Sequence, residues 1–294
     1  MAYLILSDFK KLIQTDNLSA IIGNDYSVLD QVQSAAQTEV ISYLIQKYDV
    51  SREFTDTVPF SRATTYKANN RIYLDAAAYS SATVYAANAL CLWSGNVYIS
   101  IAGNAAHAFN ASEWTLIGTQ YQIFYVSLPY PEFNYETIYK VGDQVWWKDK
   151  TYTCKAATVV LSHETQLQYG NTANLPQGNV APDDSISGFK NWGTGTAYSV
   201  TAGTLPTDTA KWTSGDNRNP QLVNYCIDIA LYTVHSRIAP RNIPDLRVKR
   251  YDDAIKWLKN AAQGQTITAN LPLIQPKSGA RIRWGSDIKK INQY

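Results

Sequence analysis

The sequence predicts an α+β protein in which a split helical bundle is interrupted by an all-β region of two related small β-modules and followed by an extended C-terminal arm. Three observations predict this architecture: helical periodicity near both ends, an aromatic middle with strand-like alternation, and an internal repeat. The chain has 294 residues, 45% of them hydrophobic, which is enough to bury a substantial core.

Helical periodicity is clearest in two places. Apolar residues from Tyr26 to Asp49 recur at helical spacing, and Ser27 is a candidate N-cap. A shorter helix is expected from Ser7 to Ile13, and another turn near Asn17. The first half of the chain therefore begins with helices.

The last third repeats this pattern. One helix is expected from Pro220, with Asn219 as its cap, because proline suits the first helical position. A second is expected from about Pro244 to Gly264, where glycine ends it. Neither end has enough apolar surface to form a core alone, so the two ends are expected to pack together.

Charge and aromatic content divide the chain in the same way. Residues 1–58 carry a net charge of −4, residues 59–216 carry −2, and residues 217–294 carry +8. The middle segment holds six of the eight tryptophans. We therefore expect a helical domain of residues 1–58 and 217–270, an inserted β region of residues 59–216, and an arm of residues 271–294.

The inserted region contains a repeat. Residues 83–102 align with residues 137–156 at a constant offset of 54, and both copies read as hairpins around a short polar turn. The expected modules span about 79–118 and 135–215, closed by Trp114 and Trp212. The aligned pairs are Thr83 and Thr137, Tyr85 and Tyr139, Trp93 and Trp147, Tyr98 and Tyr152, and Ala102 and Ala156.

The aromatic residues of the modules are the candidate recognition residues. Because successive strand residues face opposite sides, one of Trp146 and Trp147 is expected to point outward. Trp147 matches Trp93, whereas Trp146 matches Leu92, so Trp146 is the expected outward residue. The shared residues are either module core or ligand contacts: Trp93, Tyr98, Trp147 and Tyr152. The surface-recognition candidates are Trp146, Trp192 and Tyr198.

No constellation of residues predicts catalysis. Asp252 and Asp253 lie at helical spacing from lysines, which is typical of surface ion pairs. The three histidines share no motif with cysteines or acids, and the three cysteines lie far apart, so neither a zinc site nor a disulfide framework is expected. We expect no enzyme activity and no cofactor.

The composition also limits the location and the partners. The chain has no apolar run of 18 residues, which predicts a protein folded in the cytoplasm without a membrane span. A net charge of +2 is too small to predict nucleic-acid binding from the total.

The second repeat resembles a family of small modules. Its hairpin, YKVGDQVWWKDKTYTCKAATVV, is similar over about 20 residues to the carbohydrate-binding modules of chitinases and cellulases. The resemblance implies a compact β-unit with surface aromatics for chitin or cellulose. The first repeat departs from the pattern, with Asn88-Ala89 in place of Gly142-Asp143, and the same pattern occurs in phage structural proteins.

The two ends carry a different resemblance. Residues 2–13, AYLILSDFKKLI, and residues 219–272, which include RYDDAIKWLKNAAQG, resemble the head-tail connector (adaptor) proteins of tailed bacteriophages. The long helix ending in Tyr48-Asp49 also fits. The resemblance implies a virion protein of the neck: a ring, commonly of twelve subunits, that docks under the portal protein and continues the DNA channel toward the tail.

The basic tail of the chain fits an arm that reaches a partner. We expect it to contact a neighbouring subunit or the portal, with apolar anchors and charges at the rim, although a solvated terminus remains an alternative. The residues concerned are Arg281, Ile282, Arg283, Trp284, Lys289 and Lys290.

Two function classes follow. One is a connector whose β insert contacts other virion proteins while DNA passes the lumen without sequence-specific binding. The other is a carbohydrate-binding or adhesion protein.

Overall fold

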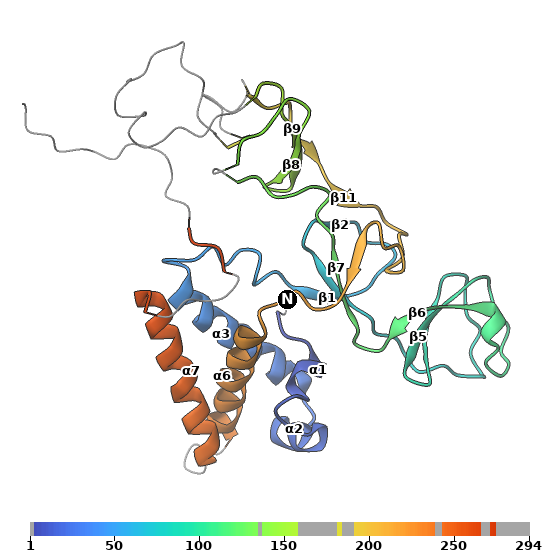
Figure 1. The fold of residues 1–294 in the computed structure, drawn as a ribbon. Coiled ribbons are helices and arrows are strands. Elements are labelled where there is room, and N and C mark those ends of the chain that lie inside the picture. The colour runs from blue at the N-terminus through green and yellow to red at the C-terminus, as the bar shows by residue number, and fades with distance from the viewer. Residues whose placement is uncertain are drawn as a thin grey trace, which may run out of the picture.

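The computed structural model describes residues 3–134, 137–157, 181–183, 191–238, 243–265 and 271–274. Its helices gather in one body and its strands lie in a separate region beside it (Figure 1). The predicted α+β class is therefore confirmed. The described helices are α1 (Leu6–Phe9), α2 (Thr15–Ile22), α3 (Tyr26–Leu44), α6 (Pro220–Ile238) and α7 (Asp245–Gln263).

The helix ends follow from local chemistry, with three differences from the sequence prediction. The N-cap of α3 is Asp25, whose carboxylate accepts a hydrogen bond from the backbone N–H of Ser27, so the predicted cap lies two residues too late. Helix α3 ends at Leu44 rather than Asp49 because the chain leaves the helix to pair Tyr48 with Leu273. Helix α1 is a single turn that ends at Phe9.

The predicted boundaries of α6 and α7 are confirmed. The side chain of Asn219 accepts hydrogen bonds from the backbone N–H groups of Gln221 and Leu222 at the start of α6. Gly264 ends α7 in the left-handed conformation, with φ of 77°.

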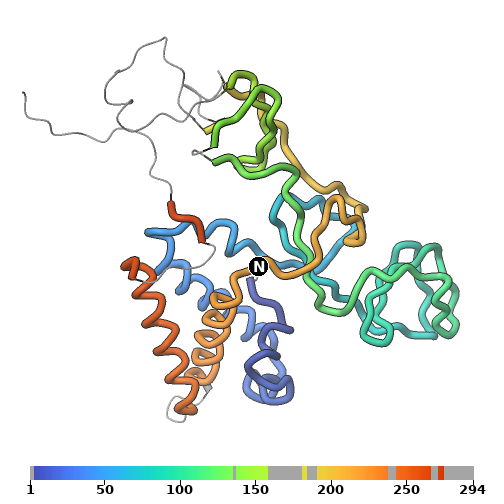
Figure 2. The backbone as a smooth tube through the Cα atoms, viewed as in Figure 1, coloured from blue at the N-terminus to red at the C-terminus, as the bar shows by residue number. Residues whose placement is uncertain are grey.

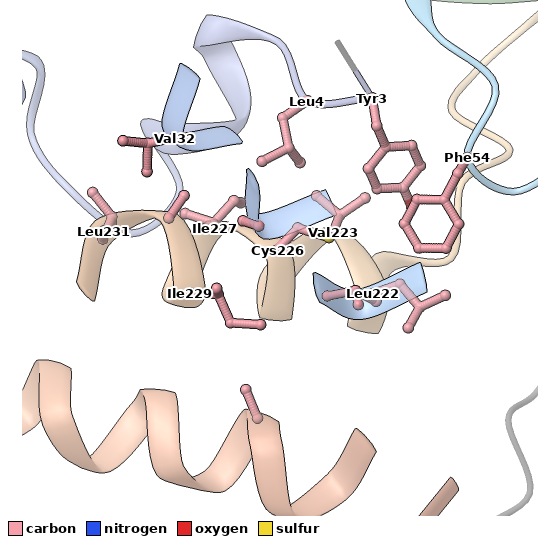
Figure 3. Close-up of a cluster of buried hydrophobic side chains, with 14 of the residues drawn as sticks. Tyr3, Leu4, Val32, Phe54, Leu222, Val223, Cys226, Ile227, Ile229 and Leu231 are labelled. Carbon is pink, nitrogen blue, oxygen red and sulfur yellow. The ribbon is translucent and has the colours of Figure 1, made fainter. Parts of the chain in front are cut away.

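One hydrophobic core holds the helical body together. Its buried residues come from residues 3–54 and 222–271 and from no described residue between these ranges. In Figure 3, Leu222, Val223 and Cys226 of α6 face Tyr3 and Phe54, which come from the other end of the sequence. The body therefore forms only when both ends of the chain meet, since neither contributes a closed core alone.

The described strands form four small sheets. The sheet orders are β1-β3-β7-β12, β4-β5-β6, β10-β9-β8 and β11-β2. The strands are β1 (Thr57–Pro59), β2 (Tyr66–Lys67), β3 (Arg71–Tyr73), β4 (Leu90–Trp93), β5 (Asn96–Ser100), β6 (Trp114–Thr119), β7 (Ile123–Val126), β8 (Gln144–Trp147), β9 (Lys150–Thr153), β10 (Thr196–Ala197), β11 (Ser199–Val200) and β12 (Trp212–Ser214).

The predicted repeat is present in the strands. The β4–β5 hairpin and the β8–β9 hairpin pair in the same register, with Trp93 opposite Asn96 and Trp147 opposite Lys150. Both turns use two residues with positive φ, Ser94 and Gly95 in one and Lys148 and Asp149 in the other, which is typical of tight hairpins. We call residues 77–120 the first module, and residues 131–157 with 191–197 the second module.

A third copy of the module is split along the chain. In the two modules, the backbone N–H of Tyr79 donates to Leu92 O and that of Phe133 donates to Trp146 O. Phe60 N–H donates to Tyr73 O in the same way. Asn69, Asn88 and Gly142 share positive φ at the matching position, and their N–H groups donate to Val126, Ser100 and Cys154 respectively. We call this third copy, formed by residues 57–74, 122–126 and 198–214, the outer module.

The nesting of the copies corrects the prediction for Trp212. This residue lies in β12 opposite Val126, so it closes the outer module. Trp192 pairs with Cys154 as Trp114 pairs with Ser100, and it therefore closes the second module in place of Trp212. Strands β10 and β11, which follow Trp192, do not pair with each other: β10 pairs with β9 and β11 pairs with β2.

The three copies lie in a row beside the helical body. Figure 2 shows the outer module, built from early and late segments of the chain, between the first and second modules. Val97, Ile99 and Ile117 of the first module share a buried core with Ile72 and Phe124 of the outer module. The second module has a smaller core of its own, which includes Phe133, Tyr152 and Trp192.

Candidate functional site

An aromatic pair forms the centre of each β-module. In each copy, a tyrosine hydroxyl accepts a hydrogen bond from a backbone N–H five residues earlier, and a tryptophan packs edge-on against the tyrosine ring. The hydroxyl bonds are Ser61–Tyr66 at 2.8 Å, Ser80–Tyr85 at 2.8 Å and Asn134–Tyr139 at 2.7 Å. The ring pairs are Tyr66–Trp212 at 5.2 Å, Tyr85–Trp114 at 5.2 Å and Tyr139–Trp192 at 5.1 Å. These aromatics hold the fold together.

The first module has an open aromatic surface. Trp93 is 42% exposed, and its ring stacks on Phe109 with centroids 4.9 Å apart and an interplanar angle of 13°. The half-buried Tyr98 contacts the same phenyl ring edge-on at 5.1 Å. Leu116, opposite Tyr98 in the sheet, is also exposed. Of the two roles left open for Trp93, module core is therefore wrong, because this residue lies at the end of its strand beside the turn.

At the matching position of the second module, Trp147 is partly buried and is held by Asp183, which lies outside the module as defined above. The Trp147 indole N–H donates to Asp183 Oδ1 at 2.7 Å, and Lys148 Nζ lies 2.7 Å from Asp183 Oδ2. Burial alone would raise the pKa of Asp183, but the bonds from Lys148 and Trp147 outweigh it and lower this pKa below its ordinary value. Tyr152 is buried, as a core residue would be.

Trp146, which was predicted to point outward as a surface-recognition residue, is buried. It is 4% exposed, and the guanidinium of Arg52 lies over its ring at 4.8 Å. Arg52 also forms an ion pair with Glu132 of the second module. Trp146 does face away from the core of its own module, but the loop that follows α3 covers it. The residue therefore joins the second module to the helical body and offers no open surface.

The other two surface candidates have different positions. Trp192 is 1% exposed, so the prediction of a surface role is wrong, because this residue closes the second module. Tyr198 is half-buried, and Lys211 Nζ lies 5.3 Å from the centre of its ring. The candidate arm residues from Arg281 to Lys290 lie outside the described part of the chain.

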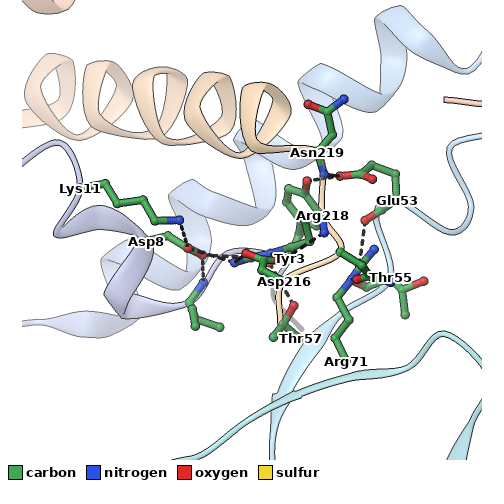
Figure 4. Close-up of polar contacts among 12 residues, drawn as sticks. Tyr3, Asp8, Lys11, Glu53, Thr55, Thr57, Arg71, Asp216, Arg218 and Asn219 are labelled. Atoms are coloured by element: carbon green, nitrogen blue, oxygen red, sulfur yellow. Dashed lines mark hydrogen bonds and ion pairs between the residues drawn. The ribbon is translucent and has the colours of Figure 1, made fainter. Parts of the chain in front are cut away.

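A buried polar network joins the helical body to the outer module (Figure 4). The side chain of Arg218 is fully buried and donates to both carboxylate oxygens of Asp8, at 2.7 and 2.9 Å. It also donates to both oxygens of Asp216, at 2.9 and 2.7 Å, and to the backbone oxygen of Tyr3 at 2.7 Å. Burial opposes the charge of Arg218, but the two carboxylates outweigh it and raise its pKa.

A second arginine completes the junction. Arg71 of β3 donates to the backbone oxygens of Glu53 and Thr55, at 2.8 and 2.9 Å, and to Asn217 Oδ1 at 2.5 Å. Glu53 in turn accepts from the hydroxyl of Tyr3 and from the backbone N–H of Asn219. This network has no signature in the sequence, because its charged members lie 2 to 210 positions apart and form no motif.

The described residues contain no group of three or more acids, histidines and cysteines placed to hold a metal ion. Among the same residues, no helix is long and apolar enough to cross a membrane.

Comparison with known families gives one match. A family model described as "Bacteriophage Mu, Gp36" matches residues 216–275, which include α6 and α7. The match supports a phage-related protein. A search of curated proteins found no match to the chain.

Proposed function

We propose that this chain is a structural protein of the virion neck, a head-tail connector that forms a ring beneath the portal protein. The observation that carries the proposal is the match of residues 216–275 to the phage Mu Gp36 family, because this segment supplies the two C-terminal helices of the helical body. The resemblance of residues 2–13 and 219–272 to connector proteins gives the proposal its specific form.

The surface of the helical body suits assembly into a ring. A closed ring needs two unlike faces that match each other around the circle. The N-terminal segment carries a net charge of −4 and the C-terminal segment +8, so one subunit presents charges of both signs. We propose a ring of about twelve copies, the number that the family resemblance implies, with DNA passing the lumen without sequence-specific binding.

In the proposed connector, the β region projects outward from the ring. The first module is suited to a protein contact, because Glu113 is the only Asp, Glu, Lys or Arg between Ala76 and Tyr121. It pairs with His107 at 2.9 Å. Charged residues are depleted at the centres of protein interfaces, so this surface favours another virion protein as its partner.

The test is the state of the purified full-length chain. Rings of about twelve copies in analytical ultracentrifugation and electron microscopy, and binding to the cognate portal protein, are the expected results. A chain that stays monomeric at high concentration and does not bind the portal protein would rule out the connector.

A second candidate function rests on the open face of the first module. Exposed aromatic rings stack on sugar rings, and the Trp93–Phe109 stack is partly open to solvent. If this face binds carbohydrate, retention on chitin or cellulose is lost in Trp93→Ala and unchanged in Trp147→Ala, a partly buried residue whose indole N–H is hydrogen-bonded to Asp183. Equal retention of both variants, or no retention of the wild type, argues against it.

A further inference from the structure

A tyrosine-lined cleft lies between the helical body and the outer module. Its volume is about 290 Å³, and its walls include Tyr26 and Asp30 of α3, Tyr73 of β3, and the nearby Asp75 and Tyr121. We call it the tyrosine cleft. It combines three aromatic rings with two carboxylates, which are the groups that bind a lysine or arginine side chain.

The charges in the cleft are not neutralised within the described part of the chain. Neither Asp30 nor Asp75 forms an ion pair there; the hydrogen bonds to their side chains come from the amides of Gln33 and Gln120. The pKa values of Tyr73 and Tyr121 are raised, first by burial and then by nearby Asp75. The cleft therefore has a negative potential that a cation would relieve.

One cation already lies at the edge of the cleft. Lys10 Nζ is 5.2 Å from the centre of the Tyr121 ring. The contact is with the ring: among the described residues, Lys10 forms no ion pair with Asp30 or Asp75. In the tyrosine cleft, a cation therefore already contacts the Tyr121 ring, whereas the carboxylates of Asp30 and Asp75 are still available to a further cation.

The chain itself contains a segment of opposite charge. Residues 275–294 hold five basic residues and one acidic residue, Asp287. They include Arg281 and Arg283, which alternate with Ile282 and Trp284. Such a segment can place arginines beside carboxylates and apolar side chains against tyrosine rings.

The position of residue 274 sets the reach of this arm. The N–H of Ile274 donates to Lys47 O, so the arm begins beyond the C-terminal end of α3, whereas the cleft is at the N-terminal end of that helix. A helix of 19 residues is about 28 Å long. Twenty extended residues span about 66 Å, so the arm is long enough to leave its own subunit.

We propose that residues 275–294, in the C-terminal arm of one copy of this chain, bind the tyrosine cleft of the neighbouring copy. The contact joins unlike surfaces, as a ring requires. The inference rests on the proposed ring, and it names the surfaces that close it.

The binding test uses three full-length variants. In the arm-neutral variant, Arg281, Arg283, Lys289 and Lys290 are all replaced by Gln, which frees the cleft. A fluorescein-labelled synthetic peptide of residues 275–294 is expected to bind this variant, and binding is expected to weaken with added salt. Adding Asp30→Asn and Asp75→Asn is expected to weaken binding at least tenfold. Adding Asp252→Asn and Asp253→Asn instead, on the exposed face of α7, is the matched control.

The assembly test separates contacts between copies from contacts within one. The arm-neutral variant and a variant with only the Asp30→Asn and Asp75→Asn changes are each expected to lose the contact. In a 1:1 mixture of the two variants, the intact arm of the cleft variant can bind the intact cleft of the arm-neutral variant. The mixture is therefore expected to form heterodimers in analytical ultracentrifugation.

Three outcomes overturn the proposal: equal peptide binding with and without the cleft substitutions, equal losses in cleft and control variants, or peptide binding without heterodimers. The last would place the arm in its own subunit. Because the peptide titration needs no ring, it is independent of the test of the connector function.

Discussion

Arg218 is the residue on which the junction between helices and β-modules depends most. Its guanidinium lies between Asp8 of the N-terminal segment and Asp216 of the returning chain, with no exposure to solvent. A buried charge with matched partners stabilises a specific arrangement, whereas a buried charge without a partner is costly. The arginine therefore determines how the two ends of the body meet.

Replacing Arg218 with Met is expected to lower the free energy of unfolding by about 3–5 kcal/mol, because Asp8 would remain buried without its partner. Urea unfolding followed by circular dichroism measures this loss. Lys249→Met, on the exposed face of α7, is the control and is expected to change stability by less than about 0.5 kcal/mol. A loss below about 1 kcal/mol in Arg218→Met would contradict the role assigned to the network.

Asp216 gives the junction a dependence on pH. Burial would raise its pKa, but hydrogen bonds from Arg218 dominate and lower it below the ordinary value of 3.8. A carboxylate with a lowered pKa in the folded state stabilises the protein above that ordinary value, and the contribution is lost as the pH falls through the folded pKa.

We therefore expect wild type to be more stable than Asp216→Asn at pH 6, with the difference shrinking as the pH falls from about 4 to 2. Thermal unfolding at several pH values measures it. A difference that stays constant or grows in acid would show that the charge of Asp216 is not the stabilising feature.

The hairpin turns of the first and second modules differ in how well their residues suit the backbone conformation of the turn. The matching turn residues are Gly95, with φ of 78°, and Asp149, with φ of 64°. Glycine adopts this conformation without strain, whereas aspartate does so at a cost of about 1 kcal/mol. The first module therefore has the better turn.

A reciprocal exchange tests this difference. Asp149→Gly is expected to stabilise the second module by about 0.5–1 kcal/mol, and Gly95→Asp to destabilise the first module by a similar amount. The ion pair from Asp149 to Lys67 is 4.0 Å long and exposed, so its loss should matter little. Hydrogen exchange of the strand amides reports each module separately, and changes of the same sign in both variants would refute the shared turn geometry.

The helices were the elements easiest to predict from the sequence. Periodicity and the residues Asn219 and Gly264 located α6 and α7, because capping depends on neighbours in the chain. The repeat was found for the same reason, since both hairpins are continuous. The outer module was missed because its hairpin from β3 to β7 is interrupted by the whole first module, and its closing Trp212 follows the second module.

At the scale of the whole molecule, the helical body and the β region have separate cores. No described residue between Phe54 and Leu222 belongs to the core of the body. Replacing residues 60–215 with a short Gly/Ser linker is therefore expected to leave a helical protein, although Arg71 and its junction contacts would be lost. Far-UV circular dichroism measures the helix content, and loss of the helical signal would contradict an independent body.

Three buried cysteines report the stability of three parts of the molecule. Cys226 lies in the helical body, Cys91 in the first module and Cys154 in the second, and burial raises the pKa of each thiol. In pulsed thiol labelling at increasing urea, Cys154 is expected to react first and Cys226 last, since the core of the second module is the smallest described and that of the body the largest. Simultaneous labelling of all three would indicate a single cooperative unit.

The sequence by itself determined the α+β class, the helices at both ends, the repeated hairpin and the phage-related character of the C-terminal helices. These follow from periodicity, capping and motif, which depend on residues close together in the chain. Only the tertiary structure decided the exposure of the aromatic residues: Trp146 is covered by Arg52, Trp147 is capped by Asp183, and Trp93 stays open. The same holds for the third module, the Arg218 network and the tyrosine cleft, because each is formed by segments that meet only when distant parts of the chain pack together.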